Sequence, residues 1–130
     1  MKIMKYYHAT LWDNYLSSIN KEGLKIEKAI DRRIYLCKTP DDCKRFFEVR
    51  PYIWDKVITI LTLELDESTV FESTDHIEKY FGCKAYYTDK DVPPEFIKRF
   101  FNYEYPEERK QIAKSMKNES ILQVGNSGCL

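Results

Sequence analysis

The imidazoles of His8 and His76 and four cysteine thiols are the side chains in this sequence that could form a structural zinc site of the usual Cys/His type. Structural zinc sites take their ligands from clustered cysteines and histidines joined by short loops. The cysteines stand at positions 37, 43, 83 and 129, and no two of them have CxxC spacing. We therefore expect no metal site, and we interpret the cysteines as reduced thiols, some of them in the core.

Aromatic residues offer a second kind of chemistry, because their flat faces stack on flat ligands. They make up 15% of the chain, with ten tyrosines and seven phenylalanines. This content is typical of an aromatic core, and it also suits a cleft with stacking surfaces. The two interpretations are compatible.

The size and charge of the chain limit the classes of function. Its 130 residues predict a single domain, with a core over about 3–101, a helix over 107–117 and a frayed tail. Lys plus Arg and Asp plus Glu are both 21, so binding to nucleic acid through the overall field is not expected. No apolar run is long enough to span a bilayer and the start lacks a signal peptide, so we expect a cytoplasmic protein that does not enter membranes.

Short strands alternate irregularly with short helices along the chain. Residues 4–8 and 34–37 read as strands, and between them a helix of about ten residues has Thr10 as N-cap and Gly23 as its stop. Thr39 and Pro40 begin a second helix, which Pro51 ends. The remaining expected elements are strands at 56–65 and 84–88, a helix starting within 94–101, and the helix over 107–117. This order predicts an α+β fold with split, mostly antiparallel sheets rather than regular βαβ units.

Several short motifs follow one another in a particular order. The first strand ends in His8-Ala9-Thr10, and the helix after it stops at Gly23-Leu24. The second strand carries Ile34-Tyr35-Leu36, and the capped helix that follows it bears Phe46. A long apolar strand comes next, and a later strand leads into Val92-Pro93-Pro94.

This order resembles the ADP-ribosyltransferase fold over roughly residues 3–97. The resemblance is to the diphtheria-toxin-like branch, which has a His-Tyr-Glu triad and includes the poly-ADP-ribose polymerases. It implies a small split-sheet fold around a cleft for NAD, which such enzymes cleave between nicotinamide and ribose. A small free-standing domain of this kind suits a toxin or a phage effector.

The resemblance also implies roles for individual residues. His8 would bond the ribose 2′-hydroxyl, and the backbone of His8 or Ala9 would bond the carboxamide, with Thr10 completing the motif. Tyr35 and Phe46 would line the nicotinamide ring, and Arg33 (or its neighbour Arg32, or Lys38) would meet the diphosphate. Taken singly, these residues also have ordinary structural explanations: a core or surface histidine, a core tyrosine, a core phenylalanine and solvated arginines.

The family's third motif, a glutamate at the start of the late strand, is missing. Counting back from Val92 puts that position at about Lys84 or Ala85, and neither is acidic. The carboxylates that could reach in from elsewhere are Glu72 and Glu78. Without this group, chain-building polymerisation is not expected, and transfer of single units is expected to be slow or absent.

Four functions remain open. The first is a mono-ADP-ribosyltransferase that uses NAD to modify an unknown macromolecular acceptor. The second is a non-catalytic module that binds NAD or an ADP-ribose-like nucleotide. An RNA 2′-phosphotransferase ranks lower, because those enzymes carry an additional N-terminal part before the first motif. The last is an interaction protein in which the motifs are coincidental.

Overall fold

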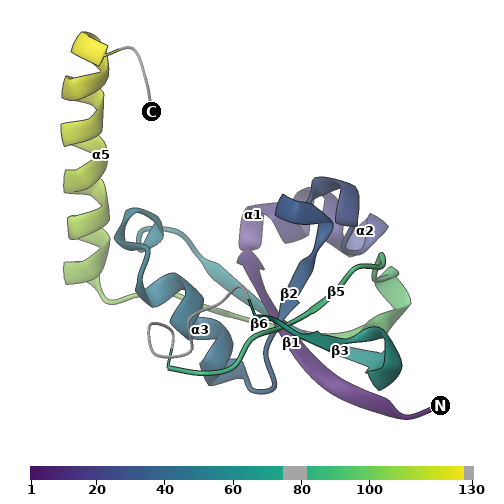
Figure 1. Ribbon diagram of the computed structural model, residues 1–130. Coiled ribbons are helices and arrows are strands. Elements are labelled where there is room, and N and C mark those ends of the chain that lie inside the picture. Colours follow the sequence, from purple (N-terminus) through teal and green to yellow (C-terminus); the bar gives the residue numbers. More distant parts are fainter. Residues whose placement is uncertain (75–81, 128–130) are drawn as a thin grey trace.

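The fold is described by a computed structural model that covers residues 1–74 and 82–127 (Figure 1). The predictions that concern His76, Glu78 and Cys129 lie outside the described residues. No cis peptide bond occurs in the described part of the chain.

Two small antiparallel sheets of three strands each form the centre of the molecule. One sheet has the order β1–β3–β6 and the other β2–β5–β4. Their bounds are β1 Ile3–Leu11, β2 Ile34–Leu36, β3 Ile58–Asp66, β4 Phe71–Glu72, β5 Tyr86–Thr88 and β6 Ile97–Tyr103. The expected α+β class with split antiparallel sheets is confirmed at this level.

Helical segments lie between the strands and after them along the chain. Residues 12–22 form α1 (Trp12–Asn14), a π turn (Tyr15–Ile19) and α2 (Asn20–Glu22), and they are followed by α3 (Pro40–Glu48) and α5 (Glu107–Ser127). Single 3-10 turns lie at Ile26–Lys28, Ile30–Arg32, Pro51–Ile53, Glu67–Thr69 and Pro94–Phe96. Figure 1 shows α5 extending away from the sheets.

The apolar run of β3 is buried on both faces where it begins. Leu61, Leu63 and Leu65 face a core formed with the second sheet and residues 15–24. Ile58 and Ile60 face a second core under α3. Because side chains alternate along a strand, β3 separates these two cores, and the helical segment 12–22 and α3 lie on opposite faces of its sheet.

Local signals at α3 explain why this helix begins where it does. The Thr39 hydroxyl accepts from the backbone N–H of Asp42 at 3.1 Å, and Pro40 occupies the first helical position. Asp41 and Asp42 complement the positive end of the helix. The cap at Thr39 and the proline at position 40 agree with the sequence-based prediction.

Two expectations from the sequence are wrong. Thr10 is not a helix cap, because β1 continues past it to Leu11 and Thr10 pairs with Thr59 of β3. No helix runs from Pro94, because only one 3-10 turn forms before residues 97–103 pair with β3 as strand β6. In both places pairing with a central buried strand outweighs the local signal.

Candidate functional site

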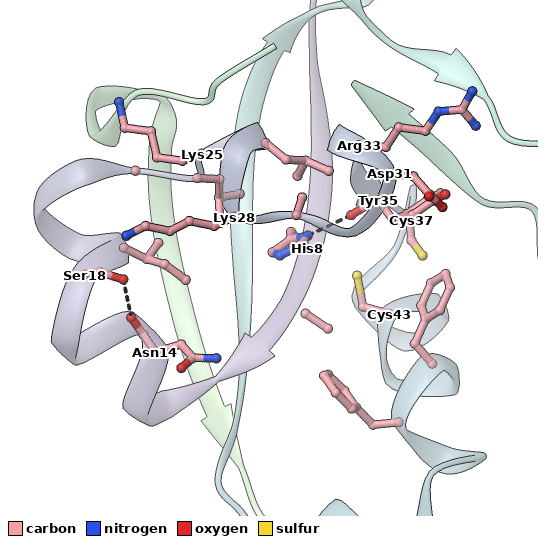
Figure 2. A pocket seen from close by; sticks show the side chains of 18 of the residues that line it. His8, Asn14, Ser18, Lys25, Lys28, Asp31, Arg33, Tyr35, Cys37 and Cys43 are labelled. Carbon is pink, nitrogen blue, oxygen red and sulfur yellow. Dashed lines mark hydrogen bonds between the residues drawn. The ribbon is translucent and has the colours of Figure 1, made fainter. Parts of the chain in front are cut away.

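A cavity of about 720 Å³ opens where β1 and β2 separate (Figure 2). The two strands touch at one antiparallel bridge, in which Tyr7 and Cys37 exchange backbone hydrogen bonds of 2.8 and 2.9 Å. Beyond this bridge the cavity is bounded by the segment 12–22, the connection that follows it, β2 and α3. Its volume falls in the range of roughly 300–1,000 Å³ that is typical of small-molecule sites.

The structure brings five of the six predicted site residues to this one cavity. They are His8, Ala9, Arg33, Tyr35 and Phe46. Thr10, which pairs with Thr59 of β3, is not among the lining residues. The assignment of a binding role to the five residues remains a prediction.

His8 is held by the second strand. Its Nδ1 lies 2.7 Å from the backbone carbonyl oxygen of Tyr35. A carbonyl oxygen can only accept, so Nδ1 carries the proton and donates. In the neutral ring, Nε2 then has a free lone pair, and His8 acts as a hydrogen-bond acceptor.

The surroundings of His8 favour this neutral form. The pKa of the imidazole is lowered below its ordinary value of 6.5, mainly because burial disfavours the charged ring. The hydrogen bond to Tyr35 opposes this shift without reversing it. At neutral pH, His8 therefore offers an acceptor and not a positive charge.

 The backbone of Ala9 faces the cavity, and the hydrogen bonds of Tyr7 show why. The N–H and C=O of Tyr7 point toward β2, where they bond Cys37. Backbone groups two residues apart along a strand point to the same edge. The N–H and C=O of Ala9 therefore point to the same edge, beyond the bridge, where Ala9 lines the cavity.

Helix α3 forms one wall of the cavity, on the face of the β1 sheet opposite to the helical segment 12–22. Phe46 and Phe47 are partly buried, pack against the core under α3 and line the cavity. Cys43, one turn earlier, is buried and also lines it. This wall is apolar and partly aromatic, so it suits a flat ring better than a charged group.

Cationic side chains lie at the sides of the cavity, where Lys25, Lys28, Arg33 and Arg50 contribute to the lining. The lysines make ion pairs outside it, Lys25 with Asp91 at 3.7 Å and Lys28 with Glu22 at 2.9 Å. The guanidinium of Arg33 lies 4.2 Å from the centre of the Tyr87 ring. Arg32 and Lys38, the other candidates for a diphosphate, are not lining residues.

The position expected for the missing glutamate does not reach the cavity. Ala85 is only 3% exposed, and Lys84 is exposed and pairs with Glu72 at 3.6 Å. Neither residue lines the cavity. A glutamate placed at Ala85 would be buried in the protein, so it would not supply a carboxylate to the site.

Sequence reasoning missed several residues that the fold brings to the cavity. They are Asn14 and Ser18 on the first helical segment, and Lys25, Lys28 and Asp31 in the connection after it. The helical spacing of Asn14 and Ser18 places them on one face, and this was the only available signal. The connection has no periodic pattern that predicts where its side chains point.

The three described cysteines lie close together but have the character of buried thiols. Contact with Cys43 and burial raise the pKa of Cys37, and burial raises the pKa of Cys83 to about 11. Such thiols are poor nucleophiles at neutral pH. Among the described residues, no group of three or more His, Cys, Asp or Glu side chains is arranged to hold a metal ion.

Comparison of the chain with protein families, curated proteins and solved structures found no match. Within residues 1–74 and 82–127, no helix has the length and apolar character needed to cross a membrane.

Proposed function

We propose that the cavity binds NAD or a related ADP-ribose nucleotide, and that the protein is a mono-ADP-ribosyltransferase. The proposal rests mainly on one observation: the hydrogen bond between His8 Nδ1 and the Tyr35 carbonyl leaves an acceptor nitrogen in a cavity of nucleotide size. The order of motifs in the sequence supports the same interpretation.

The ribose next to nicotinamide fits the neutral His8. Its hydroxyl groups can donate to Nε2, which is the acceptor in the tautomer that the Tyr35 carbonyl selects. A charged imidazolium would have no lone pair for this contact. The lowered pKa of His8 therefore favours ribose binding at neutral pH.

The nicotinamide fits the edge of β1 and the wall of α3. A carboxamide has one acceptor oxygen and an amino donor, which complement the N–H and C=O of Ala9 at the cavity edge. Tyr35 and Phe46 offer aromatic surface for the ring. The diphosphate would then extend toward lysines 25 and 28, whose charges can attract it.

The reaction that this arrangement serves is substitution at the ribose carbon that carries nicotinamide. The carbon–nitrogen bond breaks, and its electron pair leaves with neutral nicotinamide. The ribose carbon, which develops positive charge, then bonds to a nucleophilic atom of the acceptor, and that atom loses its proton. In this scheme His8 and Tyr35 orient the ribose and the ring.

A non-catalytic nucleotide-binding module is the second candidate. The observation that favours it is the burial of Ala85, because no carboxylate reaches the cavity from the strand where the family places one. Binding would survive this loss, since it depends on ribose, ring and phosphate contacts.

Incubation of the protein with NAD tests both candidates. Chromatography measures the release of nicotinamide, and calorimetry measures the binding of NAD. For the transferase we expect both release and binding. Binding without release would identify the module. Absence of both would overturn the proposed function.

A further inference from the structure

We propose that Asp31 is the catalytic carboxylate of this site, stabilising the positive charge on the ribose and accepting the proton of the incoming nucleophile. This inference rests on the proposed function. It concerns a residue in the connection between α2 and β2, far along the sequence from the position where the motifs place an acid.

Asp31 is the acidic residue that lines the cavity. Of the side chains that line it in the described part of the chain, only Asp31 carries a carboxylate. Two nearby acids are engaged elsewhere: Glu22 pairs with Lys28, and Asp91 pairs with Lys25 and accepts from the backbone N–H of Ile26 at 2.9 Å. Asp31 is therefore the candidate that needs no rearrangement of an ion pair.

The backbone at Asp31 has an unusual conformation. Asp31 has φ 60° and ψ 15°, and Arg32 follows with φ 54°; these are the only described residues other than glycine with positive φ. Left-handed conformations are uncommon outside glycine and cluster at functional sites. Asp31 and Arg33 line the cavity, whereas Arg32 between them does not.

The position of Asp31 relative to the lysines is suitable for this role. Figure 2 shows Asp31 on the same side of His8 as Arg33 and Tyr35, and Lys25 and Lys28 on the other side. The lysines can thus meet the phosphates while the carboxylate stays near the ribose that His8 and Tyr35 hold. A carboxylate stabilises an oxocarbenium-like transition state in the same way in glycoside hydrolysis.

The protons and electrons of the step balance without another reactant. The bond between ribose and nicotinamide breaks, and nicotinamide keeps the electron pair. The acceptor, or water in its absence, bonds to the ribose carbon and gives its proton to the Asp31 carboxylate. The proton then passes to solvent, to which Asp31 is exposed.

The test compares nicotinamide release from NAD by the full chain and by Asp31→Asn and Asp31→Gly. Both replacements remove the charge, and both residues tolerate positive φ, so neither should disturb the turn. Asp89→Asn is the matched control, because Asp89 is exposed and does not line the cavity. NAD affinity by calorimetry and the melting temperature are measured for all four proteins.

We expect both Asp31 variants to lose turnover by about 10²–10³-fold, with NAD affinity within about threefold of the wild type and an unchanged melting temperature. Asp89→Asn should match the wild type. If the wild type releases nicotinamide and Asp31→Asn does so within threefold of its rate, the role of Asp31 is refuted while the transferase stands. If the wild type binds NAD without release, or does not bind it, both the transferase and the role of Asp31 are refuted, and the affinity tells these two cases apart.

Discussion

His8 and Tyr35 are joined by a hydrogen bond of 2.7 Å, although 27 positions separate them in the sequence. The bond lies just past the Tyr7–Cys37 bridge, where β1 and β2 begin to separate. It fixes both the orientation of the imidazole and the nitrogen that carries the proton. The strand separation that opens the cavity therefore also prepares its acceptor.

Replacement of His8 tests this acceptor directly. His8→Ala should weaken binding of NAD or ADP-ribose by about 1–3 kcal/mol, because one hydrogen bond to the ribose is lost. The folded state should lose only about 1 kcal/mol, since one hydrogen bond of a partly buried side chain disappears. Calorimetric titration and urea unfolding give the two quantities.

Thr10→Ala is the matched control for His8→Ala. Thr10 lies two residues further along β1, on the same face, but does not line the cavity. Its replacement should leave nucleotide affinity unchanged. Unchanged affinity in His8→Ala together with a large loss of stability would instead show that His8 has a purely structural role.

Nucleotide binding should depend on pH through His8. The pKa of His8 lies below its ordinary value of 6.5, because burial disfavours the charged ring, so the ring is neutral at pH 7.5 and gains its proton only at a pH below 6.5. Protonation of Nε2 then removes the acceptor and weakens binding. Affinity measured from pH 8 to pH 5 should fall only toward the acidic end, and the fall should be absent in His8→Ala.

The lowered pKa of His8 also makes the stability of the folded state depend on pH. In the unfolded chain His8 has its ordinary pKa, so below about pH 6.5 the unfolded state binds more protons than the folded state. The contribution of His8 to stability is therefore complete above pH 6.5 and decreases as the pH falls below it. Urea unfolding at pH 7.5 and pH 5.5 should show a smaller loss of stability in His8→Ala than in the wild type.

The aromatic wall can be tested by a change of shape that keeps an apolar side chain. Phe46→Leu removes the flat face and should weaken NAD binding by about 0.5–1.5 kcal/mol. Phe101→Leu is the control, because Phe101 is an exposed phenylalanine of β6 that does not line the cavity. Equal affinity of the two variants would exclude a contact between Phe46 and the ring.

Local sequence signals were sufficient for the parts of the fold that depend on neighbours in the chain. Thr39 and Pro40 locate the start of α3, and the apolar run after Lys56 locates β3. They failed for residues 97–103, which are a strand because β3 offers a pairing partner on that side. A propensity signal has no information about such a distant partner.

The candidate site divides in the same way. His8, Tyr35 and Phe46 belong to regular elements, and their relative placement could be expected from the order of motifs. Asp31 and Lys28 could not be found, because they lie in a connection whose path depends on tertiary contacts. One of these contacts is the bridge between Leu24 and Val92, which carries hydrogen bonds of 2.9 and 2.8 Å.

Gly23 is required for that connection to leave the helix. It has φ 76°, and a Cβ at this position would lie 2.1 Å from the carbonyl oxygen of Val92, which is backbone and cannot move aside easily. Gly23→Ala should therefore destabilise the protein by about 2 kcal/mol or more, measured by urea unfolding. Because Gly23 and Leu24 also line the cavity, NAD affinity should fall as well.

Gly82→Ala separates the close contact of Gly23 from the cost of positive φ alone. Gly82 has a similar φ of 72°, but a Cβ there would meet the guanidinium of Arg45 at 2.7 Å, the mobile end of an exposed side chain. Its replacement should cost about 1 kcal/mol, the usual penalty for a side chain at positive φ, and should not change NAD affinity. Equal losses in the two variants would mean that the contact between position 23 and Val92 does not constrain the connection, and that the path of residues 24–33 is set by other contacts.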